Sequence, residues 1–174
     1  MTRRLLTAAE VIGITGNEPP LTPDDVDAIA RRYYSPDRAA AVLTGDRERA
    51  LDTSCGGGNS EMFFMADQRG LWAHAGNDPR RAGHIPWRDL EAVLHRNATP
   101  SAVRALVDAS TALRAHVSAW NRAWIEHRYG PGSGEGDPPR YDADTGARLQ
   151  ATAHRALTDL LNGPRQLDLF TEAS

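Results

Sequence analysis

The chain has 174 residues, of which 40% are hydrophobic and 25% charged, and its formal net charge is −3. This length supports one hydrophobic core but hardly two full domains, and the composition is that of an ordinary globular protein. The small negative charge argues against a protein coated for nucleic acid, and no apolar run approaches membrane-spanning length. The N-terminus lacks the features of a secretory signal, and a single cysteine, Cys55, excludes an internal disulfide framework. We therefore expect a cytoplasmic protein with no membrane partner.

All 20 basic residues are arginine, whose planar guanidinium suits phosphate and carboxylate groups. Residues 80–128 hold 8 arginines and 4 acids, whereas 1–79 hold 8 arginines and 12 acids and 129–174 hold 4 arginines and 7 acids. The positive middle section predicts either a phosphate-facing surface or an internal electrostatic partner for the acidic ends. Both interpretations stay open.

Helix starts are well marked in the first fifty residues. A capping-box pattern lies at 7–10, and Thr22 and Ser35 each precede a proline, the residue that suits the first helical position. The helix that begins after Thr22 has a predicted apolar face, and the helix after Ser35 is expected to break near Gly45. The residues of that first face are Val26, Ile29, Ala30 and Tyr33.

The middle of the chain predicts the β structure. Apolar runs at 61–66 and 71–75 have strand length and flank a turn at 67–70. A third short strand is expected around 83–85, just before a helix over 87–95. We predict a small antiparallel meander.

Two long amphipathic helices follow, at about 100–128 and 145–162, joined by a flexible polar loop over 130–139. The apolar stripe of the first helix must pack on another helix, and the second is the obvious partner. The stripe consists of Val103, Leu106, Ser110, Leu113, Val117, Trp120 and Trp124. The fold class is therefore mainly α (α+β), a single globular domain over 1–163 with a β-meander and a flexible C-terminal tail at 164–174.

No catalytic or metal-binding constellation stands out. The glycine-rich stretch at 55–60 lacks the lysine of a phosphate-binding loop and enters a strand, so a turn is the better interpretation. Cys55 is expected to be structural, and the six histidines show no compact zinc spacing. We predict no catalytic residue, no metal and no cofactor.

The long helix carries three arginines that are candidate phosphate contacts: Arg114, Arg122 and Arg128. The alternative is an ordinary solvated helix face. We expect Trp120 and Trp124 to belong to the core rather than to a base-stacking platform.

The C-terminal tail carries the most specific pattern in the chain. Gly163-Pro164 ends the last helix, and Gln166-Leu167-Asp168-Leu169-Phe170 follows with no further element to bury its apolar side chains. This pentapeptide resembles the linear motif by which bacterial proteins dock on the DNA polymerase sliding clamp, with Asp168 at the tolerant middle position. The resemblance implies that Gln166 makes polar contacts and that Leu169 and Phe170 fill an apolar pocket of the clamp.

The magnitude of the predicted interaction is moderate. Burial of two leucines and a phenylalanine contributes about 5–9 kcal/mol before the ordering of the tail is subtracted. Micromolar affinity, about −8 kcal/mol, is then close to the upper limit for the peptide alone.

We therefore predict a non-enzymatic accessory protein of bacterial DNA replication or repair, or of a phage or plasmid, that docks on the sliding clamp. DNA is a second candidate partner. One alternative is a DNA-binding or regulatory domain whose tail is a structural strap. Another is a small enzyme that uses the glycine-rich loop or Cys55.

Overall fold

The structure is a computed structural model that describes residues 21–50, 64–66, 68–74, 82–131 and 133–163. Its helices are α2 (Pro23–Tyr33), α3 (Pro36–Thr44), α4 (Arg47–Ala50), α5 (Trp87–His95), α6 (Pro100–Tyr129) and α7 (Ala143–Asn162). Its strands are β1 (Phe64–Ala66), β2 (Gly70–His74) and β3 (Ala82–Pro86). The predicted fold class, mainly helical with a small antiparallel sheet, is confirmed. The capping box at 7–10 lies outside the described residues.

The predicted helix starts are confirmed by their side-chain caps. Thr22 accepts a hydrogen bond from the backbone N–H of Asp25, and the Asp25 carboxylate accepts one from the N–H of Thr22 at 2.9 Å. At the starts of α3 and α6, the Ser35 and Thr99 side chains accept from the backbone N–H of Arg38 and of Ala102. Each cap satisfies a backbone donor that has no partner within the helix.

The predicted break at Gly45 is also confirmed. Gly45 ends α3 in the left-handed conformation, with φ of 73°, and its N–H donates to the carbonyls of Ala41 and Val42. Glycine takes this conformation without the steric penalty of a side chain. The chain then turns into the short α4.

The sheet is the predicted meander, with strand order β1-β2-β3 and both pairs antiparallel. Leu71 lies opposite Ile85, and both are almost fully buried toward the helices. Trp72 lies opposite His84 on the other face, with ring centroids 4.6 Å apart. The alternation follows from the two-residue period of a strand.

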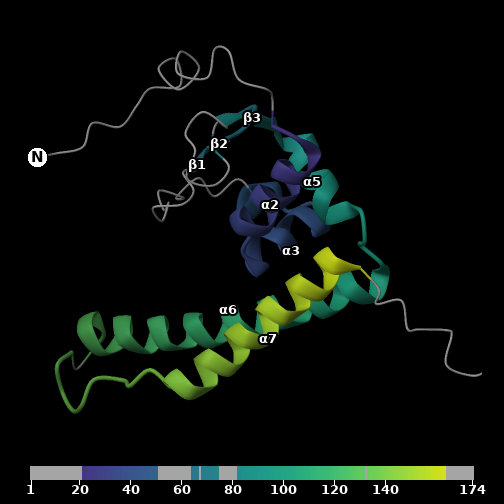
Figure 1. Cartoon of the computed structure of the whole chain (residues 1–174). Helices are drawn as coiled ribbons and strands as arrows, with labels where there is room; N and C mark the ends of the chain where they lie inside the picture. The colour runs from purple at the N-terminus through teal and green to yellow at the C-terminus, as the bar shows by residue number, and fades with distance from the viewer. Residues whose placement is uncertain (1–20, 51–63, 67, 75–81, 132, 164–174) are drawn as a thin grey trace, which may run out of the picture.

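The helices and the sheet form two regions, which we call the body and the arm (Figure 1). The body comprises α2 to α5, the sheet and the near part of the α6–α7 hairpin, residues 100–110 and 153–163. The arm is the remainder of that hairpin, residues 111–152, and it projects beyond α3. Among the described residues, the large side chains that are fully buried lie in the body: Ile29, Leu71, Leu90, Leu94, Leu106 and Leu160.

The predicted pairing of the two long helices is confirmed, since α6 and α7 run antiparallel side by side (Figure 1). The expectation that Trp120 and Trp124 belong to the core is wrong. Both lie in the arm and are half-buried, because α3 covers only the near half of the apolar stripe. The last fully covered position on α6 is Ser110, at 2% exposure.

Candidate functional site

The predicted clamp-binding residues, Gln166, Leu167, Asp168, Leu169 and Phe170, lie outside the described residues. The structure does describe the point from which they continue. Gly163 follows the last turn of α7 with φ of 75°, and its N–H bonds to the carbonyl of Leu160. This position suits glycine because an added Cβ would lie only 2.9 Å from the Asn97 side chain.

Two side chains of the body hold this end of α7. The Arg31 guanidinium donates to the Leu161 carbonyl at 3.1 Å and to the Asn162 side chain at 2.8 Å. The Asn97 amide donates to the same Leu161 carbonyl at 3.1 Å. The Leu161 carbonyl, which lacks a partner within the helix, is thereby satisfied by the body. The tail therefore continues from a fixed point.

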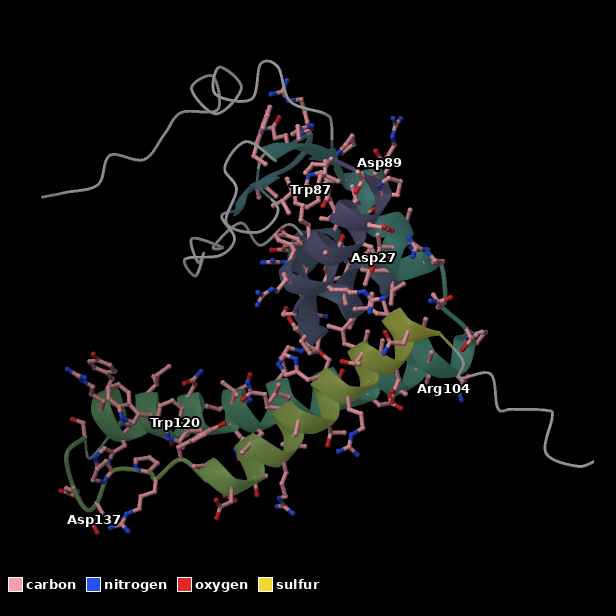
Figure 2. All side chains as sticks on the ribbon, in the orientation of Figure 1. Asp27, Trp87, Asp89, Arg104, Trp120 and Asp137 are labelled. Carbon is pink, nitrogen blue, oxygen red and sulfur yellow. The ribbon has the colours of Figure 1, made fainter. Side chains whose placement is uncertain are left out.

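An ion-pair network supports Arg31 in turn. Asp27 accepts from Arg31, one helical turn away, and from Arg96 at 2.9 Å (its position is labelled in Figure 2). The hydrogen bond from Arg31 is the main cause that holds the pKa of Asp27 below its ordinary 3.8, although partial burial opposes it. The network links α2, α5 and the end of α7.

The three candidate phosphate contacts on α6 do not form one cluster. Arg114 pairs with Asp37 of α3 at 3.2 Å, whereas Arg122 is exposed. Arg128 lies over the Trp124 ring, 4.9 Å from its centroid. Since helical residues are spaced by 100°, Arg122 lies roughly 80° around the helix from Arg114 and about 120° from Arg128. The structure gives Arg114 a role between the helices.

Asp37 is the centre of that inter-helix contact. One of its carboxylate oxygens accepts from Arg49 at 2.8 Å and from the Ser110 hydroxyl at 3.0 Å, in addition to the Arg114 pair. The bonded Ser110 hydroxyl explains how a polar residue can be buried in the predicted apolar stripe. Part of the positive middle section of the chain therefore serves as an internal partner for acidic residues from the first third.

The arm has its own centre, which we call the distal aromatic cluster: His116, Trp120 and Tyr141. The centroid of the Tyr141 ring lies 5.1 Å from that of His116 and 5.4 Å from that of Trp120. The indole N–H of Trp120 donates a hydrogen bond to the Pro139 carbonyl at 3.4 Å. Figure 2 places Trp120 on the arm, next to the loop that carries Asp137. The cluster fixes the returning loop on α6. Gly146 of α7 makes room for it, because an added Cβ would meet the Tyr141 hydroxyl at 2.2 Å.

A pocket of about 440 Å³ lies on the opposite part of the molecule, in the body. Its walls come from the end of α2, the end of α3, the short α4, the turn before β2 and the first turns of α5. They include Tyr34, Val42, Asp46, Arg47, Trp87 and Glu91. A volume of this size is typical of small-molecule sites. Figure 2 shows Trp87 in the body near the sheet, far from Trp120 on the arm.

Tyr34 is the unusual member of this pocket. It is 4% exposed, and its hydroxyl has no hydrogen-bond partner in the described part of the chain. Burial raises the pKa of the phenol far above 10, with a further contribution from the charge of Glu91, so the hydroxyl stays neutral.

Cys55 and the glycines at 56–58 lie outside the described ranges. Within those ranges, no group of three or more His, Cys, Asp or Glu is arranged to hold a metal ion. None of the helices described there is both long and apolar enough to cross a membrane.

No family model, no curated protein and no solved structure matches this chain.

No pattern in the sequence predicts the pocket as a whole. One signal was visible: Trp87 and Glu91 are four residues apart in a predicted helix and so share a face. Tyr34 comes from a separate helix, and nothing local in the sequence indicates that it lies near them.

Proposed function

We propose that this chain docks on the bacterial DNA polymerase sliding clamp through residues 166–170. It would act in the cytoplasm, as a non-enzymatic accessory protein of DNA replication or repair or of a phage or plasmid. The observation that carries the proposal is the match of Gln166, Leu167, Leu169 and Phe170 to the clamp-binding motif.

The anchored end of α7 is compatible with this role. Arg31 and Asn97 hold the Leu161 carbonyl, and five residue steps lead from Leu161 to Gln166, so the motif begins within about 18 Å of this held point. A clamp bound to the motif would therefore lie next to the body. Any further contact of the body with the clamp or with DNA would gain from this high local concentration.

The direct test is calorimetric titration of the full chain against a purified bacterial sliding clamp. We expect micromolar binding, and a loss of at least about 100-fold in the double variant Leu169→Ala with Phe170→Ala, because these apolar side chains contribute roughly 1.5–3 kcal/mol each. The matched control is Asp168→Ala, which changes the tolerant middle position and should bind like the wild type. Binding of the double variant at wild-type affinity would contradict the proposal.

A thermal melt separates docking from the strap interpretation. If the tail is free until it meets the clamp, deletion of residues 164–174 leaves the melting temperature of the chain unchanged. A strap over the domain's own core would instead lose apolar contacts, and the melting temperature would fall by several degrees.

DNA contact is a second candidate function, favoured by Arg122 and Arg128. Both are exposed, and neither forms an ion pair with another described residue. If they contact phosphates, Arg122→Ala should reduce the slope of log affinity against log salt by about 1 for duplex DNA. Arg114→Ala is a poor probe, because it also removes the Asp37 pair.

The enzyme alternative depends on Cys55 and the glycine-rich stretch. Its test is Cys55→Ala, measured as any phenotype of the cell that carries the gene. An unchanged phenotype removes the best nucleophile from that hypothesis.

A further inference from the structure

Two buried or half-buried polar groups in the wall of the pocket have no polar partner among the described residues. The first is the Tyr34 hydroxyl, which is buried and without a partner among the described residues. Buried hydroxyls nearly always have a partner, and an exception calls for an explanation such as a bound molecule. Tyr34 is the C-cap residue of α2, so the backbone fixes its place in the wall.

The second group is the Glu91 carboxylate. Glu91 is half-buried on α5, and no ion pair or hydrogen bond joins its side chain to another residue in the described ranges. Other acids of the body behave differently: Asp27 pairs with Arg31 and Arg96, and Asp46 pairs with Arg49. Glu91 is thus the wall carboxylate that lacks a cation.

The wall beside Glu91 is aromatic. Trp87 precedes Glu91 by one turn of α5, so the indole and the carboxylate face the same side of the helix. An aromatic ring next to a carboxylate attracts a cation both through the ring face and through charge. Val42 and two alanines of the wall, Ala41 and Ala50, supply apolar surface for the body of a ligand.

Arg47 limits the choice of ligand. It is exposed at the pocket and has no ion-pair partner among the described residues. Its positive charge would repel the second charged end of a polyamine. One cationic group on a small apolar body fits better.

We propose that this pocket binds a small primary amine, whose ammonium pairs with Glu91 beside Trp87 and hydrogen-bonds to the Tyr34 hydroxyl. The site is independent of the C-terminal motif and of the clamp.

The test uses three probes with the same aromatic body: 2-phenylethylamine, 2-phenylethanol and 3-phenylpropionate. Each is titrated into the full chain by calorimetry. We expect the amine to bind at least tenfold more tightly than the alcohol and the carboxylate to bind weakest. Equal binding of amine and alcohol, tighter binding of the carboxylate, or no binding of the amine at millimolar concentration would overturn the proposal.

Two variants then assign the contacts. Glu91→Gln keeps the size of the side chain. It should weaken binding of the amine at least tenfold and leave the affinity for the alcohol unchanged. Tyr34→Phe should weaken binding of the amine severalfold. It should not lower the melting temperature, because the hydroxyl has no hydrogen-bond partner among the described residues. Wild-type amine affinity in Glu91→Gln, or a fall in the melting temperature of Tyr34→Phe typical of a lost hydrogen bond, would contradict the assignment.

Discussion

The two halves of α6 are held in place by different interactions. In the body, Leu106 is fully buried and Ser110 bonds to Asp37, because α3 and α7 both cover this half. In the arm, Val117 is 36% exposed and Ile125 57% exposed, and α6 is held by rings and by the returning loop. The same apolar stripe therefore becomes core where both α3 and α7 pack on it, and stays half-exposed where α3 no longer covers it.

The difference also concerns charge. In the body, Asp27 binds Arg96 at the end of α5 as well as Arg31 of its own helix, and Asp37 of α3 binds Arg49 of α4 and Arg114 of α6. In the arm, Asp142 caps its own helix by accepting from the N–H of Thr145, and that hydrogen bond is the main cause that lowers its pKa below 3.8. Charges of the body thus connect elements distant in sequence, whereas this charge of the arm acts locally.

The largest expected effect comes from truncation of the body half of the stripe. Leu106→Ala should lower the free energy of unfolding by about 2–5 kcal/mol, since it leaves a cavity in a closely packed core. Leu113→Ala makes the same change in the arm, at a half-buried position, and should lose less than half as much. Urea unfolding measures both. Equal losses would show that the arm is packed as tightly as the body.

The next effect concerns the distal aromatic cluster. Gly146→Ala places a Cβ against the Tyr141 hydroxyl and should destabilise the chain by about 1–3 kcal/mol. In a Tyr141→Ala background the clash is gone, and the same change should stabilise by up to about 1 kcal/mol, because alanine is the better helix former. The sign of the change in unfolding free energy, measured in the two backgrounds, decides whether Tyr141 limits this position.

A smaller effect depends on pH. Because the pKa of Asp27 is lowered in the folded state, its stabilising contribution is present above the unfolded value of about 3.8 and is lost as the pH falls through the folded pKa. Asp27→Asn should lower stability at pH 7 on the order of 1 kcal/mol.

The difference between wild type and Asp27→Asn should shrink when urea unfolding is repeated at progressively lower pH. Asp142→Asn in the arm is the comparison, and its pH-dependent effect should be smaller, because Asp142 is fully exposed. A constant difference between wild type and Asp27→Asn at every pH would contradict the role given to Asp27.

The smallest effect is expected on the exposed face of the arm. Ile125→Ser should change the free energy of unfolding by no more than about 0.5 kcal/mol, because the side chain is already 57% exposed. A loss above 1 kcal/mol in a dilute sample would show that this face is covered in solution.

Local chemistry made much of the fold predictable. Caps at Thr22, Ser35 and Thr99 mark helix starts whose hydrogen bonds lie within one turn, and Gly45 marks a stop for the same reason. Periodicity over 20 or more residues identified the two long helices and their pairing. The candidate sites were less accessible: the tail motif is readable as a peptide, whereas the pocket combines Tyr34 with Trp87 and Glu91 from a distant segment.

The sequence by itself determined the helix boundaries, the strand order of the meander and the motif at 166–170, because each depends on residues close together in the chain. Tertiary structure alone decided how far α3 covers the stripe of α6, and so why Ser110 is buried and Trp124 is not. It also paired Arg114 with Asp37, whereas the sequence had presented Arg114 as a candidate phosphate contact. The physical reason is that burial and charge pairing depend on which surfaces pack together. The sequence of one segment does not specify which distant segments contact it.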